Sequence, residues 1–308
     1  MIYEINSNKS INKTIELMNE KDILILNDGI YNEKVYLIKN NITIKAKNSN
    51  KVIIQNNDYY HKIMDNNNEC NTFGTYTFYV GGNNVVLEGL HIKNLSTPSN
   101  IYGQAVALHV DGNHFKCIDC TIESAQDTLF TGPLPSDLQI RYKDFHNINI
   151  LKPNHSKQLY YMCNIIGDID FIFGCATVLF HKCFIKSINT NPKSSAYISA
   201  PAHDINTPYG YLFLECNIVC EKETYLARPW RDYGCAAFIN NNYEGEIYAE
   251  GFDKWNGSNR DKTARFYEYA KGIDITKRVT WSHQLTDIES EKYTNKFMDF
   301  IEYNSWAK

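Results

Sequence analysis

The chain has 308 residues and a formal net charge of −4, so it lacks the basic surface on which nucleic-acid binding depends. A chain of this length buries a large core, and no linker interrupts it, which predicts a single domain over residues 1–308. Residues 1–20 are polar and contain no apolar run long enough for a signal peptide or a membrane span. We therefore expect a cytoplasmic protein with no membrane association; the alternative is a secreted protein whose leader has been removed.

A helix is predicted at each end of the chain. Ser10 is a typical N-cap residue, and Ile11, Ile15 and Met18 follow it at helical spacing, so one apolar stripe can cap the end of a β-structure. Residues 288–301 again carry apolar residues at helical spacing. Between the two helices lie short β-rich runs separated by Asn, Gly and Lys turns, the first of them at residues 23–26, 34–38, 42–46, 52–54, 76–80 and 85–90.

A short motif recurs along the chain: a small or apolar residue, a variable residue and then Ile. Its copies are Leu90-His91-Ile92, Cys120-Thr121-Ile122, Cys163-Asn164-Ile165, Cys183-Phe184-Ile185 and Cys216-Asn217-Ile218. The spacing fits a coil of about 20 to 30 residues with loop insertions, which indicates a β-solenoid. Of the nine cysteines only Cys117 and Cys120 form a C-x-x-C pair, so we interpret the cysteines as a column inside the stacked coils rather than as a metal site.

Residues 131–157 interrupt this regular pattern. The stretch is polar and contains three prolines, which predicts a long loop that leaves the stack of coils. Regular strands resume after it until about residue 248, and residues 251–272 are irregular and rich in aromatic side chains.

Two carboxylates stand out in the apolar stretch from Gly167 to Gly174. In an extended strand side chains alternate between faces, so we expect Asp168 and Asp170 to point to the same side. The Phe-Ile-Phe sequence that follows Asp170 indicates a dry environment, in which a carboxylate needs a partner or a chemical task.

A third carboxylate, Asp127, is expected beside Asp170. It precedes Asp170 by 43 residues, the same interval that separates Cys120 from Cys163, so the two acids should occupy equivalent positions on neighbouring coils. Adjacent coils lie about 4.8 Å apart. Two carboxylates this close do not ionise equally, which predicts one protonated acid and one ionised nucleophile or base.

These residues resemble the pectin methylesterases, a family of carbohydrate esterases. The resemblance spans nearly the whole chain. It rests on residues 29–33 (GIYNE), 104–108 (QAVAL), 126–129 (QDTL), 167–174 (GDIDFIFG), 226–230 (LARPW) and 278–281 (RVTW). It implies an all-β fold, a right-handed parallel β-helix of the single-stranded pectin-lyase-like type, and hydrolysis of the C6 methyl esters of homogalacturonan or its oligomers.

The resemblance also implies roles for individual residues. Asp170 matches the nucleophile and Asp127 the residue that acts first as acid and then as base. Gln126 and Gln104 match the amides that stabilise the oxyanion, and Arg228 matches the partner that keeps the nucleophile ionised. The aromatic residues expected to bind sugar are Trp230, Phe173 and Trp255. The implied scheme needs no metal and no cofactor, and we expect a monomer.

Two features depart from the family pattern. Ala227 stands where Gly usually precedes the Arg-Pro-Trp motif, and residues 131–157 replace a shorter loop. The longer loop leads to the hypothesis that the cleft is narrowed and that short oligomers are preferred over the polymer.

Two other classes of function remain open. A β-helix pectate lyase or polygalacturonase would use a calcium-binding acid cluster or two carboxylates that flank a water molecule. A non-catalytic carbohydrate-binding solenoid would need the aromatic residues but not the paired Asp and Gln residues.

Overall fold

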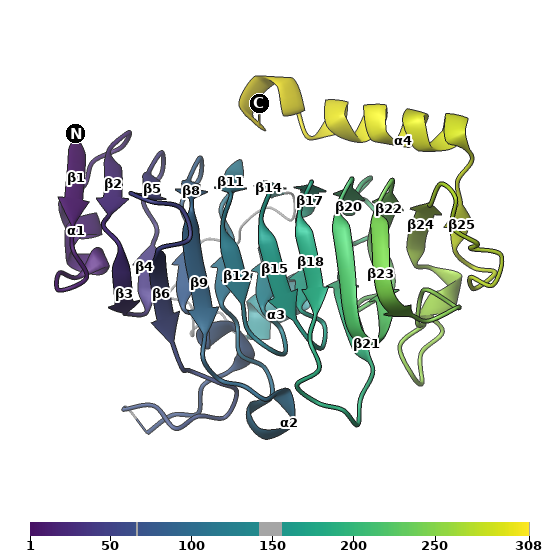
Figure 1. Cartoon of the computed structure of the whole chain (residues 1–308), viewed down its shortest axis with the longest axis horizontal. Helices are drawn as coiled ribbons and strands as arrows, with labels where there is room; N and C mark the ends of the chain where they lie inside the picture. Colours follow the sequence, from purple (N-terminus) through teal and green to yellow (C-terminus); the bar gives the residue numbers. More distant parts are fainter. Residues whose placement is uncertain (66, 142–155, 308) are drawn as a thin grey trace.

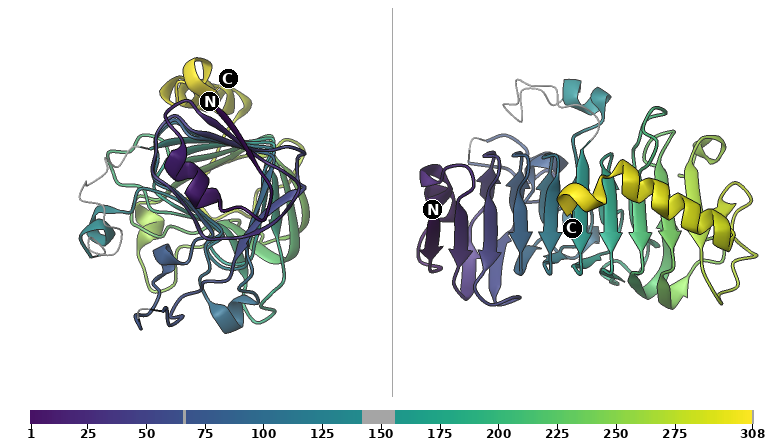
Figure 2. Two further views of the ribbon diagram at one scale, coloured as in Figure 1. Left: turned by 90° about the vertical axis from the view of Figure 1, so that its left-hand side faces the viewer. Right: turned by 90° about the horizontal axis from the view of Figure 1, so that it is seen from above.

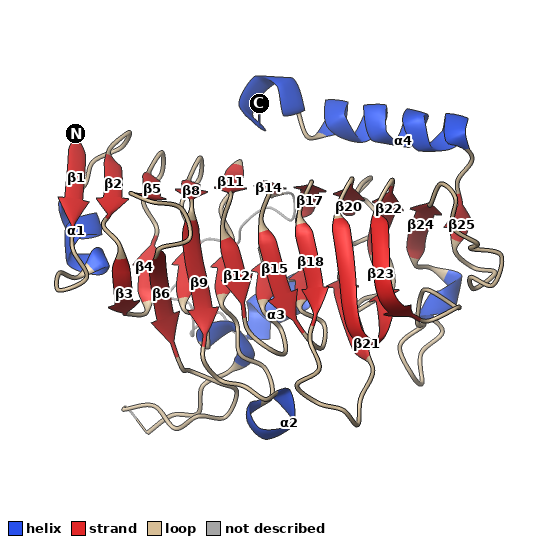
Figure 3. Ribbon diagram, in the orientation of Figure 1, coloured by secondary structure: helices blue, strands red, loops and turns tan. Residues whose placement is uncertain are grey.

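Short parallel strands stack coil upon coil along one axis in the computed structural model, which describes residues 1–65, 67–141 and 156–307 (Figure 1). Strands dominate the molecule, and the helices lie at its ends and sides (Figure 3). The fold is a parallel β-helix, as the resemblance implied. None of the helices in the described part of the chain is both long and apolar enough to cross a bilayer.

Each coil contributes strands to three faces. Within the described residues, one face is an 11-stranded parallel sheet. Its strands, in spatial order, are β1 (Ile2–Ile5), β2 (Ile23–Leu26), β5 (Thr43–Ala46), β8 (Val86–Glu88), β11 (Phe115–Ile118), β14 (Lys157–Tyr161), β17 (Thr177–His181), β20 (Tyr211–Leu214), β22 (Cys235–Ile239), β24 (Arg265–Tyr269) and β25 (His283–Gln284).

The other two faces are joined through one long strand, β21 (Asn217–Ala227). The second face contains β3 (Gly29–Asn32), β6 (Val52–Asn56), β9 (Leu90–Asn94), β12 (Thr121–Glu123), β15 (Asn164–Gly167), β18 (Phe184–Ser187), the first half of β21 and β23 (Asn242–Ile247). The third contains β4 (Val35–Leu37), β7 (Phe78–Val80), β10 (Leu108–Val110), β13 (Leu129–Thr131), β16 (Ile172–Gly174), β19 (Ala196–Pro201) and the second half of β21.

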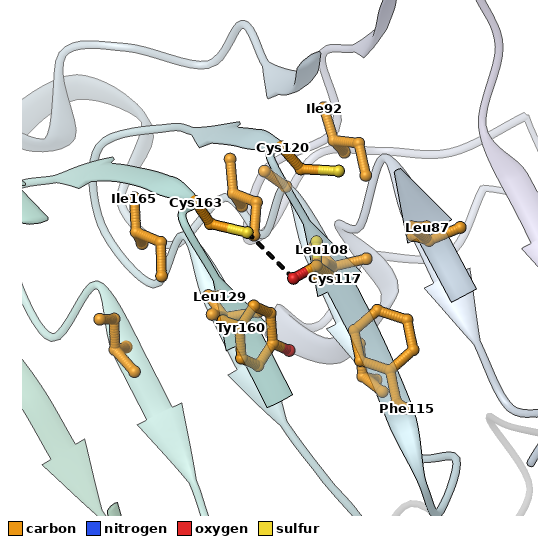
Figure 4. Close-up of a cluster of buried hydrophobic side chains, with 14 of the residues drawn as sticks. Leu87, Ile92, Leu108, Phe115, Cys117, Cys120, Leu129, Tyr160, Cys163 and Ile165 are labelled. Atoms are coloured by element: carbon orange, nitrogen blue, oxygen red, sulfur yellow. Dashed lines mark hydrogen bonds between the residues drawn. The ribbon is translucent and has the colours of Figure 1, made fainter. Parts of the chain in front are cut away.

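The predicted cysteine column lies in the core. Cys120, Cys163, Cys183 and Cys216 each precede a strand of the second face by one residue, and strand pairing sets them in register. All four are fully buried free thiols. Each of the last three donates its S–H to a backbone carbonyl of the first face, and Figure 4 shows the bond from Cys163 to the Cys117 oxygen, at 3.2 Å. The thiols therefore act as small core residues, as the sequence predicted.

Stacked aromatic rings complete the interior of the first face. Tyr160, Phe180, Phe213 and Phe238 occupy equivalent positions on four consecutive coils, with successive ring centroids 5.1, 4.6 and 4.4 Å apart. Aromatic residues repeated at one coil position thus fill the core while the strand register stays the same from coil to coil.

Both predicted helices are present. Helix α1 (Ile11–Leu17) begins after Ser10, whose hydroxyl accepts from the Lys13 amide, and it buries Ile11 and Ile15 across the N-terminal opening (Figure 2). Helix α4 (Asp287–Phe300) lies along the outside of the first face, where Phe297 packs on leucines of β14, β17 and β20. The sequence interpretation missed β1, which adds the first strand in front of α1.

Candidate active site

Two acidic residues lie side by side on the third face. Strand β13 pairs with β16 so that Leu129 aligns with Ile172, which places Asp127 and Asp170 at equivalent positions two residues earlier. The predicted coil register is therefore confirmed. Both residues have left-handed backbone angles, with φ of 63° and 49°, in a region that Asp tolerates better than most residues.

The expectation that Asp168 and Asp170 point to the same side of a strand is wrong. Strand β15 ends at Gly167 and β16 begins at Ile172, so both acids lie in the turn between two faces of the helix. The left-handed conformation of Asp170 breaks the alternation that an extended strand would impose. Asp168 is fully buried and pairs with Lys222, whereas Asp170 pairs with Arg228.

Arg228 binds Asp170 through two parallel hydrogen bonds. Its Nε donates to Oδ1 at 2.7 Å and its Nη2 to Oδ2 at 2.6 Å. The guanidinium carbon also lies 3.7 Å from the ring centre of Tyr197 and 4.2 Å from that of Trp255. A guanidinium held between two aromatic rings loses little orientational freedom when it binds a carboxylate in this forked geometry.

The two acids differ in their ease of ionisation. Burial raises the pKa of Asp127 well above its usual value, and the charge of Asp170 adds to this rise. Burial also raises the pKa of Asp170, but the charge and the hydrogen bonds of Arg228 oppose that effect. The pKa of Asp170 is still raised on balance, but the bidentate ion pair favours its ionised form, and the division into one protonated and one ionised acid stays a prediction.

All eight site residues predicted from the sequence line one pocket of about 250 Å³. They are Gln104, Gln126, Asp127, Asp170, Phe173, Arg228, Trp230 and Trp255. The two glutamines come from adjacent coils, because Gln104 forms a parallel bridge with Gln126. The pocket thus holds two acids, one cation and two neutral amides beside an aromatic surface.

The pocket is also lined by three residues that the sequence did not predict: Thr72, Phe73 and Ala200. Thr72 and Phe73 belong to a short 3₁₀ turn (Thr72–Gly74) in a loop, where no periodic pattern marks them. Phe73 packs against Phe130, with ring centres 5.2 Å apart, and belongs to the same apolar cluster as Phe173 and Trp230. Ala200 aligns with Phe173 on the next coil, so register alone indicates its position.

The predicted loop at residues 131–157 is described only in part. Helix α3 (Ser136–Arg141) lies within it, and Leu134 and Leu138 pack against the aromatic cluster beside the pocket. Arg231, which lies over the Trp230 ring, forms an ion pair with Asp137 at 3.0 Å. Residues 142–155 lie outside the described residues, so the narrowing of the cleft stays a prediction.

A search for metal ligands covers the part of the chain that the structure describes. There, no group of three or more His, Cys, Asp or Glu side chains is arranged to hold a metal ion.

Comparison with known proteins identifies the family. The pectinesterase family model matches residues 4–134 and 140–303. Putative pectinesterase 10 of Arabidopsis thaliana is 27% identical over 306 residues, which cover 95% of this chain and 80% of that protein. Several other relatives, named pectinesterase/pectinesterase inhibitor, are longer, and the chain spans about half of their length.

Solved structures share the fold. A pectin methylesterase from carrot superimposes with a TM-score of 0.82 at 21% identity, covering 99% of this chain and 94% of that one. A pectin methylesterase in complex with a hexasaccharide gives a TM-score of 0.75 at 22% identity, covering 94% and 92%. On the strength of the family model, which matches nearly all of the sequence, the chain belongs to the pectinesterase family of carboxylic ester hydrolases.

Proposed function

We propose that this chain is a pectin methylesterase that releases methanol from the C6 methyl esters of homogalacturonan or its oligomers. The observation that carries the proposal is the unequal pair of acids: Asp170 is held by Arg228, and Asp127 beside it has a raised pKa. One ionised carboxylate and one protonated carboxyl group in the same pocket can divide the tasks of nucleophile and acid.

In the first step Asp170 attacks the ester carbonyl carbon. The carbonyl electrons move onto oxygen, and the amide N–H groups of Gln104 and Gln126 stabilise the resulting oxyanion. When the tetrahedral intermediate collapses, the bond to the methoxy oxygen breaks. Asp127 gives its proton to that oxygen, so methanol leaves and an anhydride joins Asp170 to the sugar.

In the second step Asp127, now ionised, takes a proton from water. The hydroxide attacks the sugar acyl carbon, and the second tetrahedral intermediate releases the Asp170 carboxylate. The products are a galacturonate carboxyl group and methanol, and both acids return to their starting protonation states. Arg228 assists because a paired carboxylate is a better leaving group than an unpaired buried one.

We further propose that Trp230, Phe173 and Trp255 bind the sugar rings. Aromatic side chains in a shallow pocket provide flat apolar area for the carbon-hydrogen faces of sugars. The likeness in fold to a pectin methylesterase solved with a hexasaccharide supports an oligosaccharide ligand. The chain is proposed to act as a single domain and as a monomer, which size-exclusion chromatography with light scattering tests directly.

The decisive experiment measures methanol release from highly methylated pectin and from methylated trigalacturonate. Wild type and Asp170→Asn are compared, and absorbance is followed for unsaturated products. Asp274→Asn, an exposed acid far along the chain, serves as the matched control. We expect methanol from the wild type and the control and none from Asp170→Asn, and the preferred substrate tests the hypothesis of short oligomers.

Two results would contradict the proposal. A folded wild type that binds pectin but releases no methanol would indicate a carbohydrate-binding solenoid. Unsaturated products would indicate a lyase. The cytoplasmic location expected from residues 1–20 stays a prediction, and detection of the protein in the culture supernatant instead of the cell lysate would contradict it.

A further inference from the structure

Asp168 is a buried charge that the proposed reaction does not use. Its side chain is 0% exposed, and its Oδ1 lies 2.5 Å from Nζ of Lys222, which is itself only 10% exposed. Its Oδ2 accepts hydrogen bonds from the hydroxyls of Ser99, at 3.1 Å, and Thr190, at 2.5 Å. We call Ser99, Asp168, Thr190 and Lys222 the Asp168 cluster.

A buried ion pair such as that of Asp168 and Lys222 is not explained by stability alone. Moving two charges out of water carries a large free-energy cost that their pairing has to offset, and apolar residues of similar volume often fill a core equally well. Within the described residues, no member of the cluster lines the substrate pocket. We therefore expect any effect of the cluster on the reaction to pass through residues that do line this pocket.

Members of the Asp168 cluster contact segments that carry residues of the pocket. Ser99 lies in helix α2 (Ser99–Tyr102), whose C-cap is Gly103, and Gln104 is the next residue. The Asp168 amide donates to the carbonyl of Ala125, at 2.8 Å, immediately before Gln126. The Asp168 carbonyl accepts from the Tyr197 amide, at 3.1 Å, and the Tyr197 ring supports Arg228.

Cross-links also run inside the cluster. The hydroxyl oxygens of Thr190 and Ser99 lie 3.2 Å apart, and Lys222 donates to the Asn191 carbonyl at 3.0 Å. Helix α2 has only four residues and its N-cap, Pro98, makes no side-chain cap hydrogen bond, so it has little internal stability. Its hold on the rest of the protein comes in part from Ser99.

We infer that Asp168 is a positioning residue that fixes helix α2, and with it Gln104, relative to the turn that carries Asp170. This inference deepens the proposed function and rests on it. An oxyanion donor contributes fully only when its N–H lies at hydrogen-bond distance from the developing charge, so a small shift of Gln104 weakens it.

A double-mutant cycle tests this route. Ser99→Ala, which removes one hydroxyl and leaves the ion pair, should lower kcat about 5-fold at unchanged KM, less than the roughly 10²-fold or more that loss of an oxyanion donor costs. In a Gln104→Ala background the same substitution should have no further effect on kcat, because the group through which it acts is gone. Ser290→Ala, in helix α4, is the control and should leave kcat unchanged in both backgrounds.

A second measurement does not depend on activity. Thr190→Val removes the other hydroxyl from Asp168 without altering the sequence of residues 99–107. We expect faster amide hydrogen exchange in a peptide covering those residues, and unchanged exchange in peptides from α4.

The outcomes separate the two proposals. Equal effects of Ser99→Ala with and without Gln104 would overturn the inference, as would unchanged exchange over residues 99–107 in Thr190→Val. Absence of methanol release by the wild type would overturn the proposed function, while the exchange measurement still decides whether the cluster holds the Gln104 segment. Coupled kcat values together with faster exchange would support the inference.

Discussion

Asp168 and Asp170 are two residues apart and have much in common. Both are buried, both lie in the same turn, and each forms an ion pair with a cation from the later coils, Lys222 for the first and Arg228 for the second. They differ in what surrounds them. Asp168 is enclosed by hydroxyl groups, whereas Asp170 faces a pocket that also contains Asp127 and two glutamines.

The surroundings of the two carboxylates, more than their burial or pairing, separate a carboxylate proposed to react from one that is structural. Burial and pairing are common to both acids, so neither property marks the site. Under the proposed function, the pocket in front of Asp170 gives that carboxylate access to a substrate, and the second acid beside it supplies the proton.

Arg228→Met should abolish most of the activity, by about 10³-fold or more in kcat/KM. The physical reason is that burial and the charge of Asp253 then act on Asp170 unopposed, so its pKa rises and less of it is ionised. The acidic limb of the pH–rate profile should move to higher pH, which methanol release at several pH values would reveal. An unshifted acidic limb would show that Arg228 does not control the ionisation of Asp170.

Lys222→Met, the same substitution at the other ion pair, should act mainly on stability. It leaves a fully buried carboxylate without its cation, and we expect a loss of about 3–5 kcal/mol in the free energy of unfolding. The double variant Asp168→Asn/Lys222→Met removes both charges and should recover much of this loss. Chemical denaturation of the three proteins measures the effect, and a double variant as unstable as Lys222→Met would contradict it.

Gln126→Ala should lower kcat by about 10²- to 10³-fold while KM changes little, because an oxyanion donor acts in the transition state more than in the bound substrate. Gln55→Ala, at a partly exposed glutamine of β6, is the control and should match the wild type in kcat and melting temperature. A rise in KM at constant kcat would instead assign Gln126 to substrate binding.

Asp127→Asn should stabilise the protein at neutral pH. The folded-state pKa of Asp127 lies above its unfolded value, so its contribution to stability is present below the unfolded pKa and is lost as the pH rises through the folded pKa. Asn cannot ionise and escapes this loss. The melting temperature of the variant should equal that of the wild type below about pH 3, under the unfolded pKa, and exceed it increasingly toward pH 7; a constant difference would refute the raised pKa.

Much of the fold and the site was predictable because both follow a repeat. The cysteine motif gave the coil spacing, and the same spacing placed Asp127 next to Asp170. Helices α1 and α4 followed from apolar residues at helical spacing. The resemblance to a family supplied the remaining site residues, and they line one pocket.

The features that the sequence did not predict correctly lie in turns and loops outside the repeated strands. The apolar neighbours of Asp168 alternate and so predict a strand, but sequence periodicity does not show a left-handed residue such as Asp170, which makes this segment a turn. Phe73 and the partners of Asp168 belong to loops and to distant coils. Their positions depend on tertiary packing between segments that no local pattern connects.

The distribution of the pocket over stacked coils has a consequence for folding. The pocket residues come from separate coils of the solenoid: Gln104 from one, Gln126 and Asp127 from the next, then Asp170, and finally Arg228. Tyr197 lies on the coil between those of Asp170 and Arg228. Solenoids gain structure by adding neighbouring units, so no fragment shorter than this central block can assemble the site. The onset of enzymatic activity during folding would thus indicate that the central block has formed. Unfolding of the first coils, which α1 caps, would leave the rate of the reaction unchanged.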